Sequence, residues 1–263
     1  MLFDTHAHYD DERFDEDRDA MLASMPENNV GLILNPGCDA ETSRKAVSYA
    51  NRYPFVYAAV GLHPENIEDG WTQALDEIRT LAQSEPRVRA IGEIGLDYYW
   101  EKEERARARQ QVVFARQMEL ARELKLPVIV HDRDAHADCM EITRRYPDVI
   151  GVYHCYAGHI EMARELLERG YYLSFTGVIT FKNAKKAIEV IREVPIERLM
   201  VETDSPYMAR AVPRPPKFVT LHLPNGREDC RDQGNAGRGC RTYHDRKRQT
   251  PVRHRIKNFA FLC

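Results

Sequence analysis

The sequence lacks any apolar run that approaches the ~20 residues of a membrane-spanning helix. It also has no basic stretch followed by an apolar segment at its start, which is Met-Leu-Phe-Asp, so no export signal is predicted. The six cysteines include no pair at Cys-x-x-Cys spacing, which is typical of reduced thiols rather than of a disulfide framework. These absences predict a cytoplasmic protein that does not associate with a membrane.

The net charge of −3 hides an uneven distribution of charge along the chain. Residues 1–209 carry 25 Lys and Arg against 37 Asp and Glu, a balance of −12. Residues 210–263 carry 13 against 4, a balance of +9. An acidic body cannot attract a nucleic acid by broad electrostatics, so such a substrate would have to be gripped over a few nucleotides.

Apolar runs rich in Val and Ile alternate with amphipathic helical patterns, as expected for strands buried on both faces of a parallel sheet. The expected strands cover residues 1–8, 30–37, 56–64, 88–96, 126–131, 149–155, 171–177 and 198–204. The expected helices cover residues 18–25, 41–52, 71–83, 104–124, 135–145, 160–169 and 184–194. This order predicts an α/β fold of the TIM-type (β/α)₈ barrel class, with a doubly wound open sheet as the alternative.

Polar side chains stand at the ends of most of the expected strands. They are His6 and His8 on the first strand, His63 on the third, Glu93 and Asp97 on the fourth, His131 on the fifth, His154 on the sixth, and Glu202 and Asp204 on the eighth. The carboxyl ends of barrel strands meet at one face, where functional residues are found. Imidazoles and carboxylates gathered there predict a metal site.

Six motifs along residues 1 to about 209 resemble, in their order, the TatD family of metal-dependent hydrolases, which are amidohydrolase-like barrels. They are Asp4-Thr5-His6-Ala7-His8, Gly61-Leu62-His63-Pro64-Glu65, Gly92-Glu93-Ile94-Gly95-Leu96-Asp97-Tyr98-Tyr99, Val130-His131-Asp132-Arg133, His154-Cys155-Tyr156 and Glu202-Thr203-Asp204-Ser205-Pro206-Tyr207. The resemblance implies a two-metal phosphodiesterase, typically a deoxyribonuclease with 3′-to-5′ exonuclease character on single strands. DNA or an oligonucleotide is the expected substrate, and the oligomeric state stays open, with a monomer as one option.

The resemblance also implies a set of metal ligands and catalytic residues. His6, His8 and Asp204 would hold one divalent ion, His131 and His154 a second, and Glu93 would bridge the two. Nitrogen and oxygen ligands together suit Zn, Mn or Mg, and the sequence does not choose among them. Two ions about 3.5–4 Å apart stabilise the attacking and leaving oxygens of a phosphoryl displacement and lower the pKa of a bound water. Asp204 and Glu93 are the expected catalytic residues, with Asp204 orienting the water and taking its proton.

Substrate contacts are expected from neighbouring strand ends. His63 and Arg133 are candidates for phosphate binding, although a structural role for His63 and an ion pair of Arg133 with a nearby carboxylate are open alternatives. The run Tyr98-Tyr99-Trp100 either stacks on a base or caps the barrel. A competing enzyme class is an amidohydrolase or lactonase on the same metal frame, but Glu93 stands where those enzymes would carry a carboxylated lysine.

The segment from Arg210 onward has no 3.6-residue apolar period, and residues 225–253 are almost free of Leu, Ile and Val. Such a composition does not build a core element, so the eighth barrel helix is expected to be missing or disrupted. Synonymous codons exist for which residues 225–252, read one base forward, give MVEKIAEIRGMPVEDVERITTENAKRLF, a TatD-like ending. We therefore predict a frameshift near Arg210, with 1–209 as the hydrolase barrel and 210–263 as a disordered, non-native tail. The alternatives are a genuine nucleic-acid-binding tail, zinc held by Cys230 and Cys240, or an inactive, poorly folded product.

Overall fold

The computed structural model describes residues 1–208, and these form one eight-stranded parallel sheet in the order of the sequence. The predicted tail of residues 210–263, and with it the predicted loss of an eighth helix, lies outside the described residues. The strands are β1 (Leu2–Asp4), β2 (Val30–Pro36), β3 (Val56–Val60), β4 (Val88–Asp97), β5 (Val128–Arg133), β6 (Gly151–Tyr153), β7 (Tyr172–Phe175) and β8 (Leu199–Val201).

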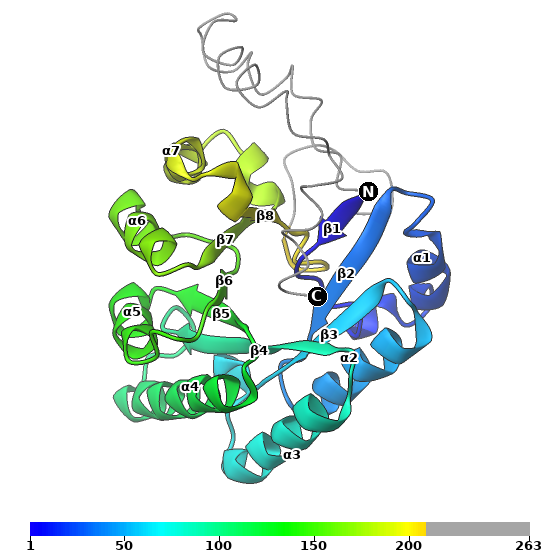
Figure 1. Ribbon diagram of the computed structural model, residues 1–263, viewed down its shortest axis with the longest axis horizontal. Coiled ribbons are helices and arrows are strands. Elements are labelled where there is room, and N and C mark those ends of the chain that lie inside the picture. Colours follow the sequence, from blue (N-terminus) through cyan, green and yellow to red (C-terminus); the bar gives the residue numbers. More distant parts are fainter. Residues whose placement is uncertain (209–263) are drawn as a thin grey trace, which may run out of the picture. The chain divides into compact units, whose positions relative to one another are not determined.

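Seven α-helices alternate with the strands and lie outside the ring that the strands form (Figure 1). They are α1 (Arg18–Ser24), α2 (Ala40–Arg52), α3 (Trp71–Ser84), α4 (Glu104–Leu124), α5 (His136–Arg144), α6 (Ile160–Glu168) and α7 (Lys185–Glu193). Short 3₁₀ turns, η1 (Glu12–Phe14), η2 (Pro64–Asn66), η3 (Gly177–Thr180) and η4 (Ile196–Arg198), complete the described chain. The predicted TIM-type barrel is confirmed, and the open doubly wound sheet is excluded. None of these helices is long and apolar enough to cross a membrane.

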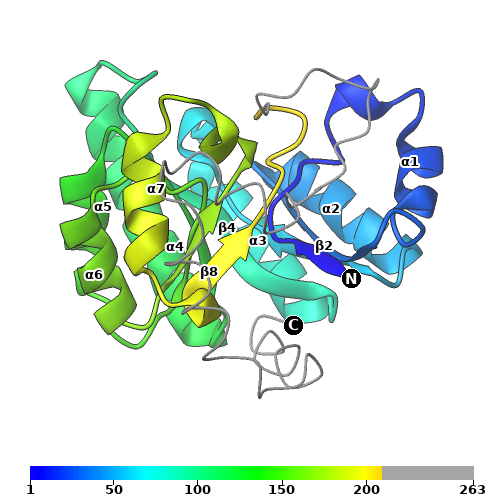
Figure 2. The ribbon, with the colours of Figure 1, turned by 90° about the horizontal axis from the view of Figure 1, so that it is seen from above.

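Backbone hydrogen bonds join the segment that follows β1 to β8 and to the residues after it (Figure 2). The amide of Thr5 donates to the carbonyl oxygen of Val201 over 3.3 Å, and the amide of Asp204 donates to that of His6 over 2.9 Å. Ala7 and Ser205 form a parallel bridge. The ends of β1 and β8 are therefore held side by side at the face where the polar strand ends gather.

The first strand is shorter than predicted. The sequence pattern extends to His8, whereas β1 ends at Asp4 and both histidines lie in the segment that follows it. After Asp4 the chain is held from two sides, because the amide of Ala7 donates to the carbonyl of Leu34 and the amide of His8 donates to that of Ser205. Single backbone hydrogen bonds to Leu34 and Ser205 keep this segment extended, although it lacks the continuous hydrogen-bond ladder of a strand.

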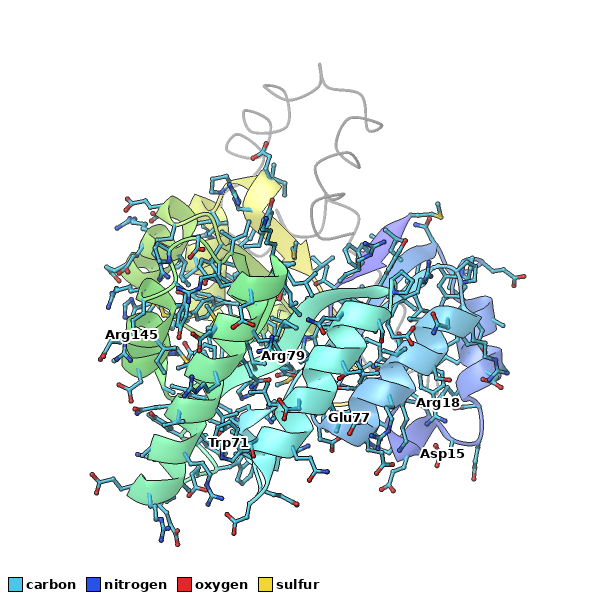
Figure 3. The ribbon with its side chains drawn as sticks, turned by 60° about the horizontal axis from the view of Figure 1, so that its bottom comes forward. Asp15, Arg18, Trp71, Glu77, Arg79 and Arg145 are labelled. Carbon is cyan, nitrogen blue, oxygen red and sulfur yellow. The ribbon has the colours of Figure 1, made fainter. Side chains whose placement is uncertain are left out.

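Apolar side chains of the strands and the inner faces of the helices fill the core. Ile91, Ile94 and Leu96 of β4 are fully buried, as are Val128 and Val130 of β5. Each such side chain contributes about 1.5–3 kcal/mol to the free energy of unfolding. The outer helix faces are charged instead, as Figure 3 shows for Glu77 and Arg79 of α3, which pair with residues on α2 and α4. Exposed pairs of this kind contribute about 0–1 kcal/mol, so the core dominates stability.

Candidate metal centre

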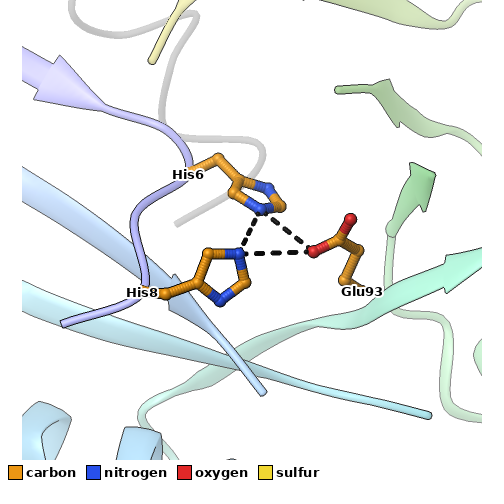
Figure 4. Close-up of side chains that lie close together, drawn as sticks. All are labelled: His6, His8 and Glu93. Carbon is orange, nitrogen blue, oxygen red and sulfur yellow. Dashed lines mark hydrogen bonds and ion pairs between the residues drawn. The ribbon is translucent and has the colours of Figure 1, made fainter. Parts of the chain in front are cut away.

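The carboxylate of Glu93, near the middle of β4, lies at the centre of the polar cluster. Its Oε2 is 3.1 Å from Nε2 of His6 and 3.5 Å from Nε2 of His8 (Figure 4). The two imidazole Nε2 atoms are 3.0 Å apart. Oδ1 of Asp204 lies 3.7 Å from Nε2 of His6 and 3.6 Å from Nε2 of His8. Glu93 and three side chains from the two ends of the described chain thus converge on one point.

The other oxygen of Glu93 faces a second group of imidazoles. Oε1 lies 2.8 Å from Nδ1 of His131, 2.7 Å from Nε2 of His154 and 3.5 Å from Nε2 of His63. The nitrogens of His131 and His154 that face Glu93 are 3.2 Å apart. One carboxylate therefore separates two sets of donors, with one oxygen directed at each set.

Local backbone features bring these side chains together. Gly95 pairs with His131 across β4 and β5, and a Cβ at Gly95 would lie 1.9 Å from the carbonyl oxygen of His131, so only glycine allows the two strands to approach here. Asp204 adopts a left-handed backbone with φ of +49°, and Cys155, directly after His154, has φ of +42°. Such conformations are uncommon outside glycine and often occur at functional sites.

Carboxylates lie behind two of the histidines, and one of them is within hydrogen-bond distance of its histidine. Oδ2 of Asp97 lies 3.0 Å from Nε2 of His131, on the side of the ring that faces away from Glu93. Glu202 lies 3.6 Å from Nδ1 of His154, and its Oε1 accepts a hydrogen bond from the amide of Cys155 over 2.6 Å. The hydroxyl of Ser174 donates to the other oxygen of Glu202. A hydrogen bond such as that between Asp97 and His131 orients metal-binding histidines in other proteins.

Burial and neighbouring charges shift the titration of the cluster. Burial opposes ionisation of Glu93, yet the charges of the surrounding histidines hold its pKa well below its usual range. Burial lowers the pKa of His63 to about 4, with the charge of His131 acting in the same direction. Burial raises the pKa of Asp204, which the histidines partly offset. The cluster therefore combines a strongly ionised central carboxylate with a second carboxylate that takes up protons more readily.

The donor set fits divalent metal ions. Two Nε2 atoms 3.0 Å apart cannot both carry protons in the space between them, so at least one of them directs a lone pair into the cluster. Tetrahedral ligands about 2.0–2.2 Å from one ion lie about 3.3–3.6 Å from one another. The donor distances given above for His6, His8, Glu93 and Asp204 run from 3.0 to 3.7 Å. The second group offers the same chemistry, so two ions could be held.

The two candidate substrate contacts, His63 and Arg133, lie in different places relative to the cluster around Glu93. His63 joins the cluster, and its Nδ1 accepts a hydrogen bond from the amide of Glu65 over 3.2 Å, which directs Nε2 at Glu93. Arg133 lies beside aromatic side chains that follow β4. Its guanidinium lies 4.1 Å from the ring centroid of Tyr99 and 5.5 Å from that of Trp100. Its function as a phosphate contact stays a prediction.

Several residues around the cluster were given no function by the sequence. Asp97 and Glu202 were recognised as polar strand ends, but nothing in the sequence assigns them to a particular histidine. Cys38 was not singled out, and its Sγ lies 3.8 Å from Nδ1 of His8. Asp4 accepts hydrogen bonds from the amide and hydroxyl of Thr203 over 2.9 and 2.7 Å. Asp4, Asp97 and Glu202 stand inside the quoted motifs, which was the one available signal, whereas no motif contains Cys38.

A (β/α)₈ barrel with histidines and carboxylates clustered at one face is typical of metal-dependent hydrolases. The family model described as TatD related DNase matches residues 3–227. The chain belongs to the TatD family, as the sequence motifs predicted.

Similar proteins agree with this assignment. The chain is 42% identical over 210 residues to an uncharacterized metal-dependent hydrolase, YabD, of Bacillus subtilis (strain 168), covering 79% of this chain and 81% of that protein. It is 35% identical over 212 residues to the 3'-5' ssDNA/RNA exonuclease TatD of Cronobacter turicensis, covering 79% of each. The crystal structure of YjjV, a TatD homologue from Escherichia coli K12, superposes with a TM-score of 0.75 and 27% identity over 99% of this chain and 95% of that one.

Proposed function

We propose that this protein is a nuclease that uses two divalent ions to hydrolyse phosphodiester bonds of single-stranded DNA from the 3′ end. The arrangement of donors around Glu93 carries the proposal, because its two oxygens face separate groups of nitrogen donors. The exonuclease name of the Cronobacter relative supports a nucleic-acid substrate and leaves RNA as a second polymer to be tested.

The chain's own residues have separate tasks in this reaction. His6, His8 and Asp204 would hold one ion, His131 and His154 the other, and Glu93 would contact both. Bound divalent ions would supply Lewis acidity to the phosphate and lower the pKa of water. Asp204 orients the attacking water and accepts its proton, a task that suits a carboxyl group whose pKa is raised by burial. His63 donates from Nε2 to a phosphate oxygen, since Nδ1 is already used as an acceptor.

The decisive experiment is a nuclease assay on single-stranded DNA with and without EDTA, followed by return of Mg, Mn or Zn. Activity is expected to disappear with EDTA and return with at least one metal. Glu93→Gln and Asp204→Asn are each expected to lower kcat by at least about 10²-fold, a typical loss for a general base or an electrostatic group. The exposed carboxylate of Asp76 provides a matched control, and Asp76→Asn should keep full activity. Nuclease activity that survives EDTA would refute the mechanism.

Metal binding can be tested without any substrate. Ligands that bind only the folded state raise its stability by about 2.7 kcal/mol at 100 times the dissociation constant. The midpoint of thermal unfolding is therefore expected to rise on adding the activating metal to the EDTA-treated protein. Glu93→Gln should reduce this rise, since it removes a charge that faces both donor groups. Hydrolysis of amides or lactones, in place of DNA, would indicate the alternative enzyme class. A cytoplasmic location stays a prediction from the sequence.

A further inference from the structure

Exposed aromatic side chains gather at one end of the barrel. Within residues 1–208 four aromatic side chains are exposed, and all four follow the carboxyl end of a strand. Tyr99 is 43% and Trp100 60% exposed after β4, Phe181 is 38% exposed after β7, and Tyr207 is 58% exposed after β8. These loops share the face that carries the candidate metal centre. Gathered exposure of large apolar groups at one face indicates a binding surface.

Trp100 is tied by hydrogen bonds to the candidate metal centre. Its backbone amide donates to Oδ1 of Asp97 over 2.9 Å. The other oxygen of Asp97 lies 3.0 Å from Nε2 of His131, whose Nδ1 is 2.8 Å from Glu93. A single carboxylate thus positions both a candidate metal ligand and the start of the aromatic loop. The backbone of Trp100 is consequently held by the same carboxylate that contacts His131.

Two cations lie beside the same aromatic pair. The guanidinium of Arg133 is 4.1 Å from the centroid of Tyr99, and Nζ of Lys102 is 5.5 Å from it. The rings of Tyr99 and Trp100 meet at 82° with centroids 4.7 Å apart, so Tyr99 packs against the exposed indole in an edge-to-face contact. Aromatic rings flanked by Arg and Lys are typical of surfaces that bind single-stranded nucleic acids.

Because residues 1–209 carry a net negative charge, the stacking of bases on aromatic side chains is an important source of affinity for a nucleic acid. Residues 1–209 carry a balance of −12, so phosphates are not attracted over a broad surface. Base stacking on an aromatic side chain needs no net charge and tolerates every base, since each base has an aromatic face. A chain of this composition therefore needs an uncharged source of affinity next to the metals.

Building on the proposed function, we propose that Trp100 stacks on a nucleobase next to the scissile phosphate of a single-stranded nucleic acid, while Tyr99 and Arg133 position the indole. Stacking of one base on an aromatic residue corresponds to a change of about 5- to 150-fold in affinity. The proposal assigns Trp100 as a substrate-binding residue and Arg133 as a positioning residue.

The first test compares hydrolysis of oligothymidylate with hydrolysis of an oligomer of the same length that carries abasic residues. The full chain is used with its activating metal. Trp100→Ala is expected to lower the ratio of the two kcat/KM values by about 5- to 150-fold, and Trp100→Phe should restore part of that ratio. Equal losses on both oligomers would overturn the proposal, because they would indicate a structural effect.

The second test measures binding by fluorescence and does not require turnover. The chain contains two tryptophans, Trp71 and Trp100, so Trp71→Phe leaves Trp100 as the single indole. Oligothymidylate is expected to quench this fluorescence more strongly than the abasic oligomer. Quenching without hydrolysis would support stacking and refute the proposed nuclease activity. Hydrolysis without quenching, and with an unchanged ratio in Trp100→Ala, would refute stacking and leave the nuclease proposal standing. Absence of both would refute both.

A matched control is available at the opposite end of the barrel. Tyr172 begins β7, and the guanidinium of Arg198 lies 4.7 Å from its ring centroid. Tyr172→Ala removes an aromatic ring beside an arginine without touching the loops that follow the strands. This variant should leave the ratio of the two kcat/KM values unchanged.

Discussion

Asp97 holds His131 by the ring nitrogen that faces away from Glu93. Oδ2 of Asp97 is 3.0 Å from Nε2 of His131, whereas Nδ1 of the same ring is 2.8 Å from Oε1 of Glu93. A carboxylate beside Nε2 favours the tautomer that carries its proton there, which leaves the lone pair of Nδ1 directed into the cluster. The carboxylate therefore determines which nitrogen of His131 is free to bind.

Replacement of Asp97 by Asn should weaken the second metal position. The amide keeps the shape of the side chain but removes the charge that favours the Nε2 tautomer. We expect a loss of about 10- to 100-fold in affinity for one of the two ions or in activity. Titration of activity against metal concentration measures it, with Asp76→Asn as the control. An unchanged metal titration for Asp97→Asn would show that the tautomer of His131 is set elsewhere.

The bonds between Asp4 and Thr203 should contribute to barrel closure. Asp4 is buried, and burial raises its pKa to about 7. At a pH above this value Asp4→Ala leaves the buried amide and hydroxyl of Thr203 without their acceptor, at a cost of roughly 1–3 kcal/mol in the free energy of unfolding. Urea denaturation measures the loss. The exposed variant Asp148→Ala should change stability by less than about 0.5 kcal/mol, and equal losses in both variants would contradict a special role for Asp4.

We expect the contact between His136 and Asp132 to make a pH-dependent contribution to the free energy of unfolding. Its Nδ1 lies 2.8 Å from Oδ2 of Asp132, and this hydrogen bond raises the pKa of His136. Because the folded-state pKa is raised, the stabilisation is fully present below the ordinary value of about 6.5 and is lost as pH rises through the folded-state pKa. His136→Ala should therefore cost up to about 1 kcal/mol near pH 5.5 and much less near pH 9.

A pH-independent pair provides the control for His136. Arg144 pairs with Glu165, and neither group changes charge between about pH 6 and 9. The cost of Arg144→Ala should stay constant over that range. If the cost of His136→Ala were also constant over that range, the raised pKa of His136 would not contribute to the stability of the fold.

The predicted frameshift can be tested in the gene itself. Sequencing across codons 205–215 should reveal an inserted or deleted base relative to a frame that continues with a TatD-like ending. Codons that are incompatible with the shifted reading would exclude the hypothesis. The frame-restored chain should also melt at a higher temperature, since a helix that buries several hundred Å² of apolar surface contributes several kcal/mol at ~25 cal/mol per Å². Equal melting temperatures would contradict this expectation.

Apolar periodicity was enough to predict the order of strands and helices, because strands that are buried on both faces are continuous runs rich in Val and Ile. It did not locate the end of β1, because the segment around His6 is held by bonds to residues almost 200 positions away. The barrel rule placed His6, Glu93 and His131 at one face, and the structure brings them together. The contact of Arg133 with Tyr99 depends on side-chain directions that spacing in the sequence does not define.

The bridge between Ala7 and Ser205 has a consequence for biosynthesis. His6 and His8 are translated first, whereas their neighbour Asp204 leaves the ribosome only after β8 has been synthesised. Throughout that interval the nascent chain carries an incomplete set of donors. The candidate hydrolytic centre is thus among the last features of the barrel to assemble, and any polypeptide terminated before β8 would lack it.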